Sequence, residues 1–303
     1  MPLKQIVGHI VSCYLNGRLA GSPDRAELAR IVDLANRHPN WLAAVATAVR
    51  VPTNFGFDIT CDRRSGIGQT LIADGEWEGL LSRTILACLQ PGDTAIDIGA
   101  NIGYDTLLMS HAVGPNGLVF AFDPEPENFS MLLRNICDAP HGNVVPISLG
   151  AAESLMLGNI SVTDAYYRGH PNMRPDQAGR TRKVIATRLD QLVTLPPDAH
   201  IALVKIDIEG FEYGAIRGMG ALIDKVSVLT CEINHRFLDQ CGSSAAEIFS
   251  YMQARGFTSY CGVSQSDTQW QAADHGYQIS DKQTHFDAMF CREIPERLHG
   301  LIA

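Results

Sequence analysis

Several features that mark common protein classes are missing from this sequence. The eight cysteines occur without any C-x-x-C spacing, so they are expected to be reduced thiols in the core. No run rich in Lys or Arg occurs in a chain of net charge −9, which argues against nucleic acid as the main partner. No apolar run approaches the roughly 18 residues of a membrane-spanning helix, and no signal-peptide pattern is seen. These absences predict a cytoplasmic protein that binds neither membrane nor nucleic acid.

One stretch organises the rest of the chain. Residues 94–106 read T-A-I-D-I-G-A-N-I-G-Y-D-T. The apolar run at 94–98, broken by one carboxylate, is typical of a buried parallel strand. Closely spaced glycines follow, and a helical pattern comes after them. A strand, a tight glycine loop and a helix N-terminus form the cofactor-binding elbow of an α/β sheet.

The acids around this elbow indicate which ligand it holds. The loop reads G-x-N-x-G, not the G-x-G-x-x-G of dinucleotide sites, which disfavours a nicotinamide dehydrogenase. Asp97 and Asp105 would repel a pyrophosphate but suit a cationic ligand such as S-adenosylmethionine. Asp123 ends the next apolar run, 117–122, and is placed to accept hydrogen bonds from two ribose hydroxyls.

Three motifs in order carry a family resemblance. They are P-G-D-T-A-I-D-I-G-A-N-I-G-Y-D-T at 91–106, G-L-V-F-A-F-D-P-E-P-E-N-F at 117–129 and V-K-I-D-I-E-G-F-E at 204–212. Together they resemble the FkbM-type family of S-adenosylmethionine-dependent methyltransferases, over roughly residues 70–235. Asp123 departs from the family, which more often has Glu at that position.

The resemblance implies a class I, Rossmann-like α/β fold with a doubly wound, mostly parallel, seven-stranded sheet. We expect strands at 94–98, 117–122, 143–148, 201–206 and 226–231, closed by an antiparallel pair at 257–262 and 285–292. Residues 1–50 are expected to form a helical segment with helices at 4–16 and 24–49. Residues 51–303 would form the methyltransferase domain, with a core at 79–293, a lead-in β-hairpin at 51–72 and a lid or hairpin insertion at 157–186.

The cofactor-binding residues are expected around the elbow and the ends of two further strands. Glu78 is included by resemblance, although an acid there could simply stabilise a helix N-terminus. The full expected set is Glu78, Asp97, Gly99, Ala100, Asn101, Gly103, Asp123, Pro124 and Asp207.

The acceptor is expected over the carboxyl ends of the fourth and fifth strands. His235 is the expected base, with Asp207 and Glu209 as alternatives, while Glu209 could also merely favour a helix start. Expected substrate contacts are Tyr166, Tyr167, Arg168 and His170 in the insertion, with Glu232 and Asn234 at the strand ends. His285 and Asp287 are interpreted as edge residues. Asp207, Glu209, Glu232 and Asn234 are hard oxygen ligands, but no spacing demands a metal and none is predicted.

These features predict methyl transfer to a hydroxyl on a sugar or secondary-metabolite acceptor, with S-adenosylhomocysteine as the product. A short peptide is a further acceptor class. N-methylation of a small molecule or peptide is the alternative reaction, and a non-catalytic module that binds S-adenosylmethionine or a nucleoside is the alternative of another class. The N-terminal helices could support a homodimer, but nothing in the sequence shows one.

Overall fold

The structure, a computed structural model, describes residues 48–162, 180–262, 268–273 and 285–303. The chain divides into two units, 1–49 and 50–303, and the second is described here. The helices predicted at 4–16 and 24–49 lie outside the described residues, except that Ala48 and Val49 belong to strand β1 (Ala48–Pro52) and not to a helix.

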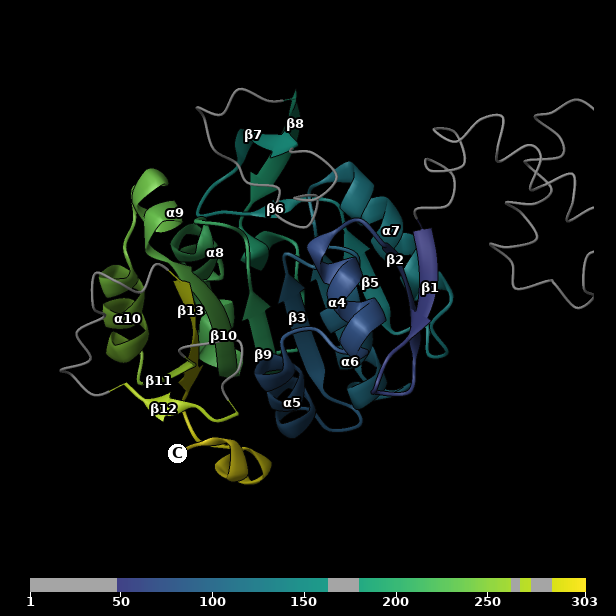
Figure 1. The fold of residues 1–303 in the computed structure, drawn as a ribbon. Helices are drawn as coiled ribbons and strands as arrows, with labels where there is room; N and C mark the ends of the chain where they lie inside the picture. Colours follow the sequence, from purple (N-terminus) through teal and green to yellow (C-terminus); the bar gives the residue numbers. More distant parts are fainter. Residues whose placement is uncertain (1–47, 163–179, 263–267, 274–284) are drawn as a thin grey trace, which may run out of the picture. The chain divides into compact units, whose positions relative to one another are not determined.

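An eight-stranded sheet forms the centre of this unit, in the order β12-β11-β13-β10-β9-β3-β4-β5 (Figure 1). Strands β3 (Thr94–Ile98), β4 (Leu118–Phe122), β5 (Val144–Ile147), β9 (Ile201–Ile206) and β10 (Val226–Asn234) are parallel. Strand β13 (His285–Cys291) runs antiparallel between β10 and β11 (Thr258–Gly262). The predicted fold class is confirmed, and β12 (Gln271–Ala272) is an additional edge strand of two residues.

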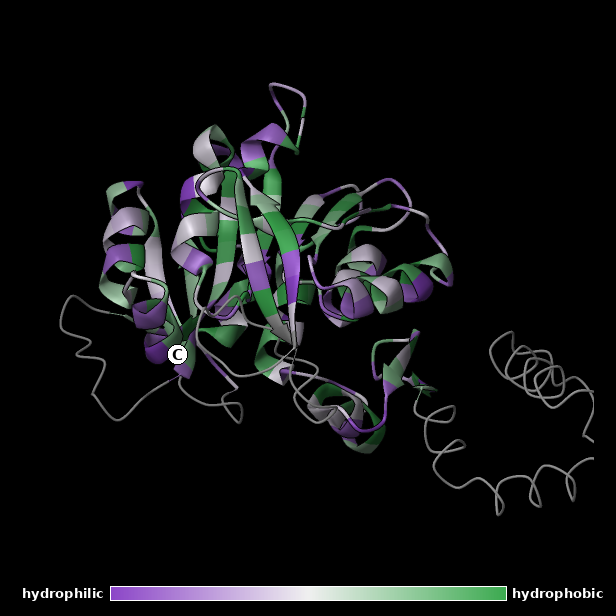
Figure 2. Ribbon diagram, turned by 90° about the horizontal axis from the view of Figure 1, so that it is seen from above, coloured by the Kyte–Doolittle hydropathy of each residue, from purple (hydrophilic) through white to green (hydrophobic). Residues whose placement is uncertain are grey.

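Helices cover both faces of this sheet, because its parallel strands carry apolar side chains on both faces. Helices α5 (Gly79–Cys88), α6 (Tyr104–Val113) and α7 (Pro126–Cys137) lie on one face. Helices α8 (Glu212–Gly218) and α10 (Ala245–Ala254) lie on the other. Figure 2 shows mainly hydrophobic strands in the middle and helices with mixed surfaces around them.

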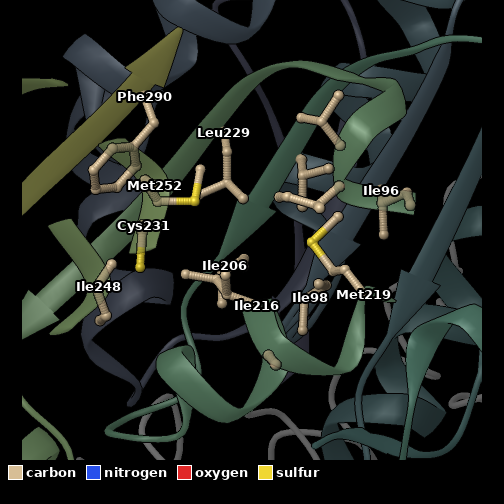
Figure 3. Packing of buried hydrophobic residues seen from close by; sticks show 14 of the residues in the cluster. Ile96, Ile98, Ile206, Ile216, Met219, Leu229, Cys231, Ile248, Met252 and Phe290 are labelled. Carbon is tan, nitrogen blue, oxygen red and sulfur yellow. The ribbon is translucent and has the colours of Figure 1, made fainter. Parts of the chain in front are cut away.

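The core on the α8 and α10 side is built from the residues of β3, β9 and β10 that point to that face. Ile96, Ile206 and Leu229 pack there with Ile216 of α8 and Met252 of α10 (Figure 3). All five side chains are fully buried, and each contributes roughly 1.5–3 kcal/mol through burial. This packing holds the carboxyl ends of the three strands in register.

Two smaller sheets flank the core. Strand β1 pairs with β2 (Asp58–Asp62), but the predicted hairpin is too long, because residues Gly66–Asp74 form helix α4. The Ser65 side chain caps that helix by accepting a hydrogen bond from Gly68 N, and Gly75 ends it in a left-handed conformation. The other sheet, in the order β6-β8-β7, comprises β6 (Gly150–Ala151), β7 (Met156–Val162) and β8 (Arg180–Thr187). The predicted strand pair of the insertion is therefore present as β7 and β8, which are antiparallel.

The remaining elements are short. Helix α9 (His235–Gln240) follows β10 directly, and three 3-10 helices lie at Leu189–Gln191 (η2), Gly220–Lys225 (η3) and Glu296–Leu301 (η4). The seven described cysteines are free thiols, and five of them are buried, as expected for core residues. In the described part of the chain, no helix is both long and apolar enough to span a membrane.

Trp270 ties the C-terminal segment to helix α5. Its indole is fully buried, and Nε1 donates to Thr84 Oγ1 at 2.8 Å. Trp270→Phe removes that hydrogen bond and part of the packing, so we expect the free energy of unfolding to fall by about 1–3 kcal/mol. Urea denaturation measures this, and Thr84→Val provides the matched removal of the acceptor. An unchanged denaturation midpoint in both variants would contradict the role of this contact.

Candidate active site

A large cavity opens at the carboxyl ends of β3, β4 and β9. It encloses about 640 Å³, including its open mouth. Apolar side chains form most of its walls, and carboxylates stand at its edge. The lining residues are Ile98, Gly99, Asn101, Phe122, Asp123, Pro124, Glu125, Asn128, Leu149, Gly150, Ala151, Ile160, Asp207, Ile208, Glu209 and Phe211. This is where ligands bind in doubly wound sheets.

The glycine loop between β3 and α6 is held by hydrogen bonds to the end of β4. The amides of Gly99 and Ala100 both donate to Phe122 O at 2.9 Å, so neither is available to cradle a phosphate. Gly99 has φ of +86°, and a Cβ atom there would lie 1.9 Å from Asp207 O. Glycine is therefore required because β3 and the end of β9 approach each other at this point.

Asp123 closes one end of the cavity, directly after β4. One carboxylate oxygen accepts from Asn101 N and the other from Glu125 N, each at 2.8 Å. The side chain is buried, and that burial raises its pKa to about 7 despite these two hydrogen bonds. Each oxygen can still accept another hydrogen bond, so the group suits a ligand with two neighbouring hydroxyls.

On the α5 side, the sheet changes from apolar to charged toward its carboxyl edge. Ala95, Leu203, Val228 and Cys291 form an apolar row across four strands. Two positions along, Asp97 pairs in register with Lys205, and Lys205 with Thr230. At the edge itself, Glu232 lies opposite Asp287. The opposite face of the same strands stays apolar, so the charges are confined to one side.

Lys205 is the cation at the centre of this charged region. Its Nζ donates to Gly99 O at 3.0 Å and lies 3.4–3.7 Å from carboxylate oxygens of Asp97, Asp105 and Asp207. Burial alone would lower the pKa of Lys205, but the three carboxylates hold it well above its ordinary value. Lys205 therefore stays charged and ties β3, α6 and β9 together.

A second, smaller cavity of about 240 Å³ lies next to the first and shares Asp207 with it. Its other charged residues are Glu78, Lys205, Glu232 and Asp287. Burial raises the pKa of Glu78 and Glu232 well above the ordinary value, and the neighbouring carboxylates add to the effect. Burial, with the charge of Asp207, raises the pKa of Asp287 to about 7.

Backbone strain in the described residues is concentrated at these two cavities. Glu78, Asn101 and Glu209 are the non-glycine residues there with positive φ, at 48°, 52° and 57°. Each such residue costs about 1–3 kcal/mol, and such strain clusters at functional sites. All three line one of the two cavities, which supports their inclusion among the predicted site residues.

Three residues predicted for the acceptor side, Glu232, Asn234 and His235, lie at the end of β10 and the start of α9. His235 begins α9, and its ring centroid lies 5.9 Å from that of Phe286. His235 Nε2 is buried and has no hydrogen-bond partner among the described residues. Asn234 caps α9, because its Oδ1 accepts a hydrogen bond from Phe237 N at 3.3 Å. This oxygen atom therefore stabilises the start of the helix.

The structure brings together most, but not all, of the predicted cofactor residues. Gly99, Asn101, Asp123, Pro124 and Asp207 line the large cavity, and Glu78 lines the small one. Three others do not line either cavity. Asp97 is fully buried and accepts a hydrogen bond from Thr106 Oγ1 at 2.5 Å. Ala100 packs in a small apolar cluster. Gly103 lies against Leu132, because a Cβ atom on Gly103 would be 2.7 Å from Leu132 Cδ1. The predicted contacts Tyr166, Tyr167, Arg168 and His170 lie outside the described residues.

Several lining residues were missed by the sequence interpretation. Asp287 was interpreted as an edge residue but faces the small cavity, and His285 Nε2 lies 2.8 Å from Glu232 Oε1. Lys205 was not among the predicted site residues. A single charged residue in an otherwise apolar strand must be paired with an opposite charge, so the sequence did indicate a buried ion pair at Lys205. Leu149 and Gly150, which follow β5, also line the large cavity.

Residues 97–259 match the family described as Methyltransferase FkbM domain. The hexuronic acid methyltransferase AglP of Haloferax volcanii is 28% identical over 210 residues, which span 67% of this chain and 83% of AglP. The 31-O-demethyl-FK506 methyltransferase FkbM of Streptomyces tacrolimicus is 25% identical over 199 residues, or 56% of this chain and 74% of that protein.

A solved structure of an rRNA methylase from Streptococcus thermophilus is 15% identical, with a TM-score of 0.42, and covers 71% of this chain and 96% of that one. The family match extends from Asp97 in β3 to Ser259 in β11 and so covers more than half of the chain. The chain belongs to the FkbM family of S-adenosylmethionine-dependent methyltransferases, with their α/β fold.

Proposed function

We propose that this methyltransferase transfers the methyl group of S-adenosylmethionine to a hydroxyl group of a sugar or a similar polyol. The observation that carries the proposal is a group of proton-accepting carboxylates at the cofactor cavity: Asp207 and Glu209 line it, and one oxygen of Glu232 lies within 4.8 Å of theirs. A hydroxyl must lose its proton during methyl transfer, whereas a neutral amine needs less basic help. Two relatives are named for a hexuronic acid and for an oxygen acceptor, which agrees with this choice.

The residues of the large cavity fit the cofactor. The Asp123 carboxylate suits the ribose hydroxyls, since each of its oxygens has acceptor capacity left. Ile98, Phe122 and Ile160 offer apolar walls for the adenine. Asp207, in the same cavity, suits the cationic methionine end, and Glu78 lies in the small cavity that shares Asp207 with it. When bound, the sulfonium group supplies the activated methyl, so the protein has to position the acceptor and remove its proton.

His235 remains our candidate for the base. Its buried Nε2 has no partner among the described residues, as expected for a nitrogen that receives a substrate proton. Asp207 and Glu209, which line the cofactor cavity, are the alternatives. His235→Gln should lower kcat by a factor of about 10²–10⁴ while leaving S-adenosylhomocysteine affinity unchanged.

The acceptor class is tested with labelled S-adenosylmethionine and matched sugars. Neutral hexosides, hexuronosides and amino sugars are incubated with the protein, and products are identified by mass spectrometry before and after alkali. We expect an alkali-stable methyl ether on a sugar hydroxyl. Methylation of amino sugars alone would indicate N-methylation, and an alkali-labile ester on a hexuronoside would assign the carboxylate as acceptor. Either result would overturn the proposal.

The pH dependence of cofactor affinity tests the role of Asp123. Its pKa of about 7 in the free protein means that the carboxylate is largely protonated at pH 6 and largely ionised at pH 8. Because ribose hydroxyls donate to the ionised form, affinity should rise about tenfold from pH 6 to pH 8. Calorimetry with S-adenosylhomocysteine measures it, with Asp123→Asn as the control whose profile should lack this rise. The same rise in Asp123→Asn would assign it to another group.

A further inference from the structure

Three carboxylates converge where the cofactor cavity meets the small cavity. Asp207 directly follows β9, Glu209 comes two residues later, and Glu232 lies in the neighbouring strand β10. One oxygen atom from each lies within 4.8 Å of the other two. Strands β9 and β10 are paired in parallel up to Ile206 and Cys231, which brings the residues after these two positions to the same edge.

The loop that carries Asp207 and Glu209 is rigidly shaped. Glu209 has a left-handed φ of 57°, and Gly210 follows with φ of 111°. The buried Glu212 carboxylate accepts from Ile208 N and Gly210 N at 2.9–3.1 Å. These bonds hold the loop in the conformation that directs the two acids toward Glu232.

The spacing and the ligand type match a hard cation. Carboxylate oxygens this close repel one another. Oxygens that share one ion with bonds of 2.0–2.6 Å are at most about 4–5 Å apart, so the three acids are close enough together to bind a single ion. Lys205 lies 3.7 Å from Asp207 Oδ2 but is shared with Asp97 and Asp105. His285 Nε2 lies 2.8 Å from Glu232 Oε1. If Glu232 binds the ion, this imidazole is the hydrogen-bond partner that orients the carboxylate.

An independent observation comes from Thr230. It lies two residues before Glu232, on the same face of β10, and lines the small cavity together with Asp207 and Glu232. Its side chain is 2% exposed, and Oγ1 has no hydrogen-bond partner among the described residues. A buried hydroxyl of this kind requires a ligand or water. The enclosed part of the cavity has room for about one ordered water beside Thr230.

We propose that Asp207, Glu209 and Glu232 bind a hard divalent cation, Mg²⁺ or Mn²⁺, between the cofactor cavity and the small cavity, with Thr230 bonded to its water. If the proposed function holds, the cation lies on the acceptor side, where an acceptor hydroxyl that coordinates it becomes more acidic. The binding site itself does not depend on the identity of the acceptor.

Electron paramagnetic resonance with Mn²⁺ tests the site directly. The metal-free full-length protein is titrated with Mn²⁺, and the loss of the free-ion signal is measured with and without saturating S-adenosylhomocysteine. We expect one Mn²⁺ per chain, retained when S-adenosylhomocysteine is present and displaced by excess Mg²⁺. Absence of binding would overturn the proposal, as would displacement by S-adenosylhomocysteine, since the cofactor would then occupy the position of the ion.

Isosteric variants assign the ligands. Glu232→Gln and Glu209→Gln should each weaken Mn²⁺ binding about tenfold or more. Asp198→Asn should leave it unchanged, because Asp198 is an exposed acid before the amino end of β9, whereas Asp207 follows the carboxyl end. Retained affinity for S-adenosylhomocysteine shows that a variant is folded. Unchanged Mn²⁺ affinity in both glutamate variants would overturn the assignment. No acceptor is needed in these measurements, so failure of the sugar assay and failure of the metal site are distinguishable.

Discussion

Replacement of Lys205 by Met is expected to lower the free energy of unfolding by about 3–5 kcal/mol, because it leaves buried carboxylates without their cation. Lys205 Nζ lies 3.6 Å from Asp97 Oδ1, and Asp97 is fully buried at the bottom of the elbow. The same ammonium lies 3.4 Å from Asp105 Oδ2 and donates to Gly99 O. Methionine keeps most of the side-chain volume, so urea denaturation of the two proteins isolates the loss of charge.

The pH dependence of this loss of stability shows whether charge or packing causes it. Burial is the main cause that raises the pKa of Asp105 to about 6 and also raises that of Asp97. Acids with raised pKa values take up protons as the pH falls, so the cost of Lys205→Met should be smaller at pH 5 than at pH 8. Adding Asp97→Asn should recover part of the stability at pH 8. An equal cost at both pH values, with no recovery, would show that packing and not charge is lost.

Replacement of Asp123 by Ala is expected to weaken S-adenosylhomocysteine binding by at least about a hundredfold. Two hydrogen bonds from ribose hydroxyls to a carboxylate are each worth roughly 1.5–3 kcal/mol, and together they correspond to about two to four orders of magnitude in affinity. Calorimetry measures the dissociation constants of the two proteins. Binding within threefold of the original would mean that Asp123 does not hold the ribose.

Asp123→Glu is the matched control, because it keeps the carboxylate and introduces the residue that is more common at this position in the FkbM family. We expect it to bind within about tenfold of the original protein. Asp123 also accepts hydrogen bonds from Asn101 N and Glu125 N, so a thermal melt has to show that the alanine variant is folded. If Glu fails as Ala does while both are folded, the length of the side chain, and not its charge, decides binding.

The elbow was predictable because its signals are local. The apolar run at 94–98, the glycines after it and Asp123 at the end of the next run all follow from residues close in sequence. The structure reproduces that strand as β3, and Asp123 lines the cavity. The carboxyl end of β10 was harder to predict from the sequence. Its last residues, Glu232 to Asn234, belong to the strand because they pair with β13.

The amino-acid sequence alone therefore determined the family, the α/β fold and the position of the cofactor elbow. The signals for them are short apolar runs, glycines and strand-end acids, each of which can be recognised within a few residues. The meeting of Glu232 with Asp287 and His285, and the position of Lys205 among three acids, required the folded sheet. Asp287 is brought to Glu232 by an antiparallel strand from far along the chain. Such contacts depend on strand order and register, which the local pattern of either strand does not contain.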